Sequence, residues 1–173
     1  GTAREYITVH VNEGEYIGDV VKRIGIEPKE IINLKLTGVL SALGLESENG
    51  DRGTIVTDRQ FNYIRHHMPN LEAINMKELR TKSFTLNYGQ FVGDDNISVS
   101  AFENMKFLSY VVWPETLKAI GDNAFMGTNL RGGVIFPEGL KHIGHNCFYG
   151  VKTLSGELYI PSTVEYIGSS ALG

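Results

Sequence analysis

The six-residue stretch Ile120–Phe125, with the sequence IGDNAF, returns twice in altered form later in the chain. IGHNCF begins at Ile143 and IGSSAL begins at Ile167. A weaker copy, ISVSAF, begins at Ile97, so the four copies start at positions 97, 120, 143 and 167. This even spacing predicts a structural repeat of about 23–24 residues that extends from position 97 to position 173.

A second repeated unit lies between these blocks and keeps the same period. It is a short apolar stretch that ends at Pro114, Pro137 or Pro161. Alternating apolar residues before each proline are typical of a β-strand, and the proline then ends the ladder pairing. The residues that we expect to face the core are Val111 and Trp113, Val134 and Phe136, and Leu158 and Ile160.

The repeated block supplies the rest of the predicted core. Glycine recurs at Gly121, Gly144 and Gly168, which favours either close stacking or a backbone angle that a side chain would block. A small residue follows three positions later, at Ala124, Cys147 and Ala171. The next position is expected to form a ladder of large side chains along the core, made of Phe102, Phe125, Phe148 and Leu172.

The part of the chain before residue 97 is less regular. Residues 4–12 alternate as a strand does, and residues 16–24 have helical spacing that ends at Gly25, so we interpret residues 1–30 as a cap on the first repeat. The repeats then fill residues 31–173 as one continuous domain, irregular over 31–96 and regular over 97–173.

Several elements are predicted within the irregular part. Strands are expected at residues 31–38 and 71–76, with Leu34 aligned to Ile74. The other elements are a polar loop at 46–53, an outer helix at 58–68 with Asp58 as its N-cap, and an inserted loop or hairpin at 78–96.

The combined pattern resembles a known family. A strand ending in proline, followed by Ile-Gly-x-x-Ala-Phe, resembles the BspA-like class of bacterial leucine-rich repeats, of the surface or secreted type in Bacteroidetes. The resemblance covers the whole chain, is strongest from Ile97 onward, and departs from the pattern at Ser98, Cys147 and Leu172. It implies an α/β right-handed leucine-rich-repeat solenoid with a parallel sheet on its concave side and short helices or turns on its convex side. It also implies a secreted or cell-surface location, with a lipid anchor as one form of attachment, and protein or matrix binding.

Composition argues against several classes of protein. The formal net charge of −4, without long runs of like charge, does not give the basic face of a nucleic-acid-binding protein. No apolar run approaches the roughly 20 residues that span a bilayer. The single cysteine, Cys147, leaves no partner for an intrachain disulfide.

The sequence gives only weak evidence for a metal site or a catalytic site. His142, His145 and Cys147 form an H-x-x-H-x-C pattern, but Cys147 takes the small core position of the repeat and the histidines take variable outer positions. We interpret the histidine pair at 66–67 as solvated and the acidic sequence at 94–96 as a turn. We therefore predict no enzyme activity, no cofactor and no metal site.

Function is expected on the exposed face of the strands. The residues that alternate with the core positions form the predicted binding face, which consists of Lys35, Asn75, Tyr110, Val112, Ile135, Glu157 and Tyr159. Clustered tyrosine and aliphatic side chains favour a binding surface, although such residues also simply suit a parallel sheet. Gly133 leaves room beside Tyr110 for a side chain of a partner.

These features predict a non-enzymatic binding or adhesion module that presents this face to a protein or glycan. One alternative is a structural segment or spacer that self-associates through its C-terminal repeat. A second is an enzyme whose site would lie between the binding face and the insertion at 88–96.

Overall fold

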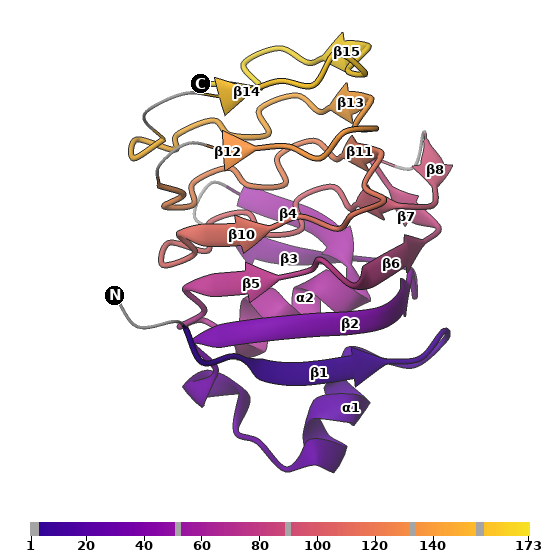
Figure 1. Ribbon diagram of the computed structural model, residues 1–173. Coiled ribbons are helices and arrows are strands. Elements are labelled where there is room, and N and C mark those ends of the chain that lie inside the picture. The colour runs from indigo at the N-terminus through magenta and orange to yellow at the C-terminus, as the bar shows by residue number, and fades with distance from the viewer. Residues whose placement is uncertain (1–3, 51–52, 89–90, 132–133, 155–157) are drawn as a thin grey trace.

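The computed structural model describes residues 4–50, 53–88, 91–131, 134–154 and 158–173. The chain forms a stack of turns in which short parallel strands lie one above another (Figure 1). The described helices, α1, α2 and the short η1, all lie at or before His67, and the rest of the described chain consists of strands and turns. This arrangement is the solenoid-like α/β repeat that the sequence predicts.

The first sheet has the order β1–β2–β5–β10, and all its strands are parallel. Its strands are β1 (Ile7–Val11), β2 (Asn33–Ser41), β5 (Ala73–Asn75) and β10 (Tyr110–Val112). A further strand, β6 (Leu79–Lys82), pairs with the second half of β2. The predicted alignment is confirmed, because Leu34 is the register partner of Ile74. Beyond β10, the strands β12 (Val134–Ile135) and β14 (Leu158–Tyr159) form a parallel pair of their own.

A second parallel sheet is built by the repeated Ile-Gly block. Its strands are β9 (Asn96–Ile97), β11 (Ala119–Ile120), β13 (His142–Ile143) and β15 (Tyr166–Ile167). Ile120 pairs with Ile97 on one side and with Ile143 on the other. Equivalent residues of successive turns are therefore neighbours, as the period of the sequence predicts.

The core between the two sheets contains the predicted aromatic ladder. The ring of Phe125 stacks on Phe102 with a centroid distance of 5.0 Å and on Phe148 with a centroid distance of 5.6 Å. All three rings are buried. Leu172, the fourth predicted member, is 39% exposed instead, because it lies in the last turn and is covered from one side only.

The structure decides between the two explanations for the recurring glycine. A Cβ atom built on Gly121, Gly144 or Gly168 would lie 2.5–2.6 Å from a backbone nitrogen of the preceding turn. None of the three has a positive φ; the left-handed positions of these turns are Asn123, Asn146 and Ser170, with φ of 61°, 54° and 55°. Close stacking therefore requires these glycines.

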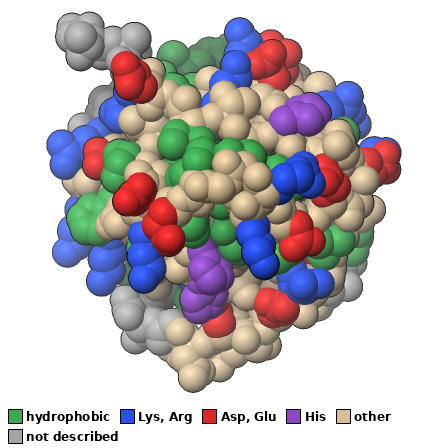
Figure 2. Space-filling model, turned by 90° about the horizontal axis from the view of Figure 1, so that it is seen from below, with side chains coloured by type: hydrophobic (Ala, Val, Ile, Leu, Met, Phe, Trp, Pro, Cys, Tyr) green, Lys and Arg blue, Asp and Glu red, His purple; other side chains and the backbone are tan. Residues whose placement is uncertain are grey.

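The N-terminal strand and helix form as predicted. The alternation of β1 buries Val9 and Val11, and α1 (Ile17–Ile24) ends at Gly25, whose φ is 82°. A short turn of 3₁₀-helix, η1 (Pro28–Glu30), follows. Figure 2 shows the molecule from this end, where charged side chains of both signs are intermingled around some apolar ones.

The predicted polar loop at 46–53 is wrong. The chain there forms β3 (Leu45–Gly50) and β4 (Gly53–Asp58), an antiparallel hairpin. The carboxylate of Glu48 forms ion pairs with Arg65 and His66 of the following helix. Tertiary contacts therefore hold this polar segment in strands.

The predicted helix is α2 (Arg59–His67), which lies behind the first sheet in Figure 1. Phe61 and Ile64 are fully buried on its inner face, as their spacing predicts. Asp58 is the N-cap, since its carboxylate accepts hydrogen bonds from the backbone N–H groups of Gln60 at 2.8 Å and Leu43 at 3.0 Å.

Replacing Asp58 with alanine is expected to lower the free energy of unfolding by about 2 kcal/mol, because it removes the cap and leaves buried N–H groups without an acceptor. Burial raises the pKa of Asp58 to about 6, so denaturation should be followed at pH 8, where the carboxylate is ionised. The matched control is Asp19→Ala, which removes an acid from the first turn of α1 and should change stability by less than about 0.5 kcal/mol. Equal losses in the two variants would contradict the capping role.

Candidate functional site

Four of the residues predicted for binding lie on strands of the first sheet, namely Lys35, Asn75, Tyr110 and Val112. Lys35 of β2 pairs with Asn75 of β5, and Asn75 pairs with Val112 of β10. Ile135 pairs with Tyr159 in the β12–β14 pair. These paired positions agree with the alignment that the sequence predicts. A binding role for the residues stays a prediction.

Two members of the predicted face make local contacts near the N-terminal part of the stack. The ammonium group of Lys35 forms an ion pair with Glu78, with 2.8 Å between Nζ and Oε2. The side-chain oxygen of Asn75 accepts a hydrogen bond of 3.0 Å from the backbone N–H of Lys77. Both side chains are thus held along the sheet, and neither lines the groove described below.

The apolar members of the face are more accessible. The side chains of Tyr110, Ile135 and Tyr159 are 47%, 71% and 51% exposed, and Val112 is half-buried between them and the core. Exposed aromatic and aliphatic side chains in one area are typical of a contact surface.

The neighbourhood of Tyr159 is only partly described. Its hydroxyl donates a hydrogen bond of 2.9 Å to Glu138, and this carboxylate raises the pKa of Tyr159. Glu157, which the sequence places on the binding face, lies outside the described residues, and so does Gly133.

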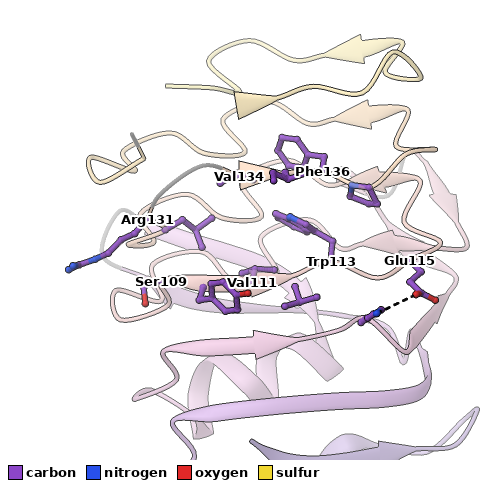
Figure 3. Close-up of a pocket in the computed structure, with 13 residues that line it drawn as sticks. Ser109, Val111, Trp113, Glu115, Arg131, Val134 and Phe136 are labelled. Carbon is purple, nitrogen blue, oxygen red and sulfur yellow. Dashed lines mark ion pairs between the residues drawn. The ribbon is translucent and has the colours of Figure 1, made fainter. Parts of the chain in front are cut away.

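In the described part of the chain, strand pairing is interrupted between β10 and β12, and a groove of about 470 Å³ lies at this interruption (Figure 3). Among the described residues, β10 pairs only with β5 and β12 only with β14. Tyr110, Val112 and Ile135 all line the groove. The structure therefore brings these three predicted residues together at one site, with Tyr159 on the strand beside it.

The floor of the groove is apolar. It is formed by residues that the sequence assigns to the core, chiefly Val111, Trp113, Val134 and Phe136. The ring of Trp113 lies 5.4 Å from that of Phe136 and 5.2 Å from that of Phe125, between centroids. Figure 3 shows Trp113 in the space between the two strands and Phe136 beside Val134 at the level of β12.

The two ends of the groove are polar. At one end Lys77 and Glu115 form an ion pair of 4.0 Å, drawn as a dashed line in Figure 3. At the other end lie Ser109 and Arg131, and the guanidinium of Arg131 extends away from Trp113. An apolar floor between a paired charge and a cation suits a ligand with an apolar centre and polar ends.

The facing edges of β10 and β12 are also unpaired among the described residues. The backbone N–H of Arg131 donates a hydrogen bond of 3.2 Å to the carbonyl of Ser109, which joins the two turns just before β10. Beyond that bond, the described residues of β10 and β12 form no backbone hydrogen bond with each other. Such edges can pair with the backbone of another chain.

The histidines and cysteine of the H-x-x-H-x-C pattern do not converge. Cys147 is fully buried at the small core position, where burial raises the pKa of its thiol. His142 stacks on Tyr166 at 4.6 Å between centroids, while Nδ1 of His145 accepts a hydrogen bond of 2.8 Å from the backbone N–H of Ser169. The described part of the chain contains no group of three or more His, Cys, Asp or Glu side chains that could hold a metal ion.

The insertion at 78–96 contains the expected hairpin, formed by β7 (Phe84–Thr85) and β8 (Val92–Gly93). Phe84 and Leu86 are buried, and the carbonyl of Leu86 accepts a hydrogen bond of 2.8 Å from the N–H of Asp122 beside the second sheet. The hairpin therefore lies against the other sheet. The placement required by the enzyme alternative, beside the binding face, is wrong.

Sequence reasoning did not find the groove itself. Trp113 and Phe136 keep the alternation of core residues, and Pro114 and Pro137 keep the spacing of the repeat, so the period does not change across the interruption. The one unusual feature is the size of Trp113, the single tryptophan of the chain, at a position filled by Phe136 and Ile160 in the following turns.

Comparison with known proteins identifies the repeats. Residues 95–173 match the family model described as BspA type leucine rich repeat region, in 6 copies. No curated protein shows a significant match to the chain. Among the described residues, no helix has the length and apolar character needed to cross a membrane.

Proposed function

We propose, on the premise that residues 95–173 belong to the BspA-type leucine-rich repeat family, that the protein is a non-enzymatic binding module that holds a segment of a partner protein in the groove between β10 and β12. Repeats of this family suggest a binding or structural module and are generally extracellular or surface-associated. In this proposal the module acts as an adhesion element outside the cell or at its surface.

The interruption of strand pairing is the observation that carries the proposal. In the neighbouring turns, parallel pairing closes the sheet over the core, as it does between β5 and β10 and between β12 and β14. At the groove the same pairing is absent among the described residues, and the floor is formed by Trp113, which is 8% exposed. An extended peptide could align its backbone with a strand edge and place an apolar side chain on this floor.

The walls of the groove favour a protein ligand. Tyr110 and Ile135 stand at its sides with large exposed surfaces, and aromatic residues with exposed surface often carry much of the energy of protein contacts. The ion pair of Lys77 with Glu115 at one end and Arg131 at the other offer polar contacts to both ends of a short segment.

Selection of peptides from a random library displayed on phage tests this function directly. Peptides that bind the parent protein are expected to carry a bulky apolar residue and to bind Ile135→Asp at least about tenfold more weakly, a loss of about 1.4 kcal/mol. Because Ile135 is 71% exposed, this change should not disturb folding. Tyr110→Ala should show a loss of the same kind.

The matched control is Phe107→Asp, which places the same charge on an exposed residue that does not line the groove. Affinities would be measured by calorimetry, and chemical-shift changes would locate the peptide. Peptides that bind Ile135→Asp and Tyr110→Ala as tightly as the parent would contradict the groove as the binding site.

A second candidate function is a structural segment that self-associates through its C-terminal repeat. Ile167 and Leu172 are 44% and 39% exposed, although their equivalents in earlier turns are buried. Light scattering over a range of concentrations distinguishes the candidates. A dimer that is lost in Ile167→Lys would support self-association, and a monomer at all concentrations would count against it.

A further inference from the structure

A second groove, of about 390 Å³, lies on the outer face of the second sheet. It is bounded by the β7–β8 hairpin on one side and by β11, β13 and β15 on the other. Figure 1 shows the hairpin beside the column of these short strands. None of its lining residues belongs to the groove between β10 and β12.

Aromatic rings form the walls of this groove. Phe91 of the hairpin is 57% exposed on one side. On the other side Tyr166 is 41% exposed and stacks on His142 with an angle of 19° between the ring planes. Ala119 is the register partner of His142, and its small side chain forms part of the floor between Phe91 and Tyr166.

Hydrogen bonds fix the position of the Tyr166 ring. Its hydroxyl lies 2.7 Å from Nε2 of His145. Nδ1 of that imidazole accepts a hydrogen bond from the backbone N–H of Ser169. The hydrogen of the ring is therefore on Nε2, which donates a hydrogen bond to the tyrosine oxygen. A ring held on both its face and its hydroxyl is a preorganised surface for a ligand.

Two lysines lie at the edge of the groove. Lys118 and Lys141 are neighbours in successive turns, joined by a backbone hydrogen bond of 2.8 Å from Lys141 N–H to the carbonyl of Lys118. Both are exposed, and neither forms an ion pair with any described residue. The nearby carboxylate of Asp95 is already bound to Arg80 at 2.8 Å and to Thr116 at 2.9 Å.

The remaining polar groups at the rim are of mixed type. Asp94 and Glu165 offer carboxylate oxygens and Asn87 is an amide, while Asn96 is buried and donates to the carbonyl of Phe84. Hydroxyl groups of a ligand can donate to such carboxylates, and an anionic group can accept from the two ammonium groups. The strands below the groove are paired in the order β15–β13–β11–β9, so the two inner strands offer only side chains to a ligand, and β15 is an edge strand.

We infer that this groove binds an acidic saccharide, with the sugar carboxylate at Lys118 and Lys141 and the sugar ring packed between Phe91 and Tyr166. A pyranose ring has C–H groups on its faces, which pack on aromatic rings, and hydroxyl groups at its edge, which meet the polar rim. This ligand matches the two exposed lysines, which lie side by side, and the aromatic side chains at the walls of the groove.

The test uses an oligogalacturonate of about four units as the acidic probe and its methyl ester as the matched neutral probe, with binding followed by calorimetry at low salt. The acid should bind at least about tenfold more tightly than the ester, and Lys118→Gln/Lys141→Gln should remove this preference. Tyr166→Ala should weaken binding about tenfold, while Tyr166→Phe, which keeps the ring, should stay within about twofold. Phe91→Ala serves as a second aromatic variant if Tyr166→Ala loosens the last turn.

The matched control for charge is Lys22→Gln/Lys29→Gln, which removes two exposed lysines from the other end of the molecule and should leave affinity unchanged. A hexaglutamate peptide tests whether charge alone is sufficient. The inference is overturned if the acidic probe does not bind at millimolar concentration, if the lysine and aromatic variants bind it as the parent does, or if hexaglutamate binds equally well.

Discussion

Replacing Phe125 with alanine is expected to lower the free energy of unfolding by about 3–5 kcal/mol, the range found when a buried phenylalanine is truncated in a core. Its ring is fully buried and stacks on Phe102 and Phe148, at 5.0 and 5.6 Å. Trp113 also contacts it edge-on at 5.2 Å. Because each turn of a repeat stack is stabilised mainly by its neighbours, a cavity here weakens the interfaces on both sides.

Chemical denaturation followed by circular dichroism measures this loss. The matched control is Phe107→Ala, since Phe107 is 59% exposed and its truncation should change stability by no more than about 0.5 kcal/mol. A loss in Phe125→Ala no larger than that of the control would mean that the aromatic ladder does not couple the turns.

The regular half of the fold could be predicted because one period controls two elements of each turn. The Ile-Gly block and the proline-terminated strand repeat with the same spacing, so a single register places Ile120 beside Ile97 and Ile143. The asparagines at the left-handed positions, such as Asn123, also belong to this block. Asparagine adopts that conformation more readily than most residues, so Asn123 and Asn146 were a signal for their two turns that the prediction from spacing did not include, while serine holds the position in the other copies.

The irregular part, residues 31–96, was harder to predict because its strands and turns depend on tertiary contacts. The segment around Glu48 contains few residues that favour strands, yet it pairs with β4 and its carboxylate bonds to Arg65 on α2. Strand formation depends strongly on such surroundings, so the local sequence indicated a loop.

The candidate site could also be predicted only in part, because the groove depends on contacts that the local sequence does not determine. Alternation along the strands correctly placed Tyr110, Val112 and Ile135 on one exposed face. The groove among them depends on whether β10 and β12 pair, and the sequence spacing is identical whether they do or not. Only the structure reveals that β10 and β12 do not pair among the described residues and that Trp113 lines a groove between them.

A second large effect is expected for Gly144→Ala, which should lower the free energy of unfolding by at least about 3 kcal/mol, at the upper end of the cost of overpacking. The added Cβ would lie 2.5 Å from the backbone nitrogen of Asp122 and 2.7 Å from the carbonyl carbon of Gly121. No rotamer change can relieve contacts with backbone atoms. Moving the turn apart would strain the 2.9 Å hydrogen bond from Gly144 N–H to the carbonyl of Ile120.

Gly139→Ala separates this steric effect from the conformational one. Gly139 has a φ of 99° but no atom within 4 Å of the position that an added Cβ would occupy, so its replacement should cost only about 1–2 kcal/mol, from the left-handed backbone alone. Denaturation of the two variants under the same conditions compares them. The larger loss should come from Gly144, whose backbone angle any residue can adopt, because the spacing between turns leaves no volume for a side chain. The reverse order would mean that the turns can separate at little cost and that close stacking is not what fixes glycine in the repeat.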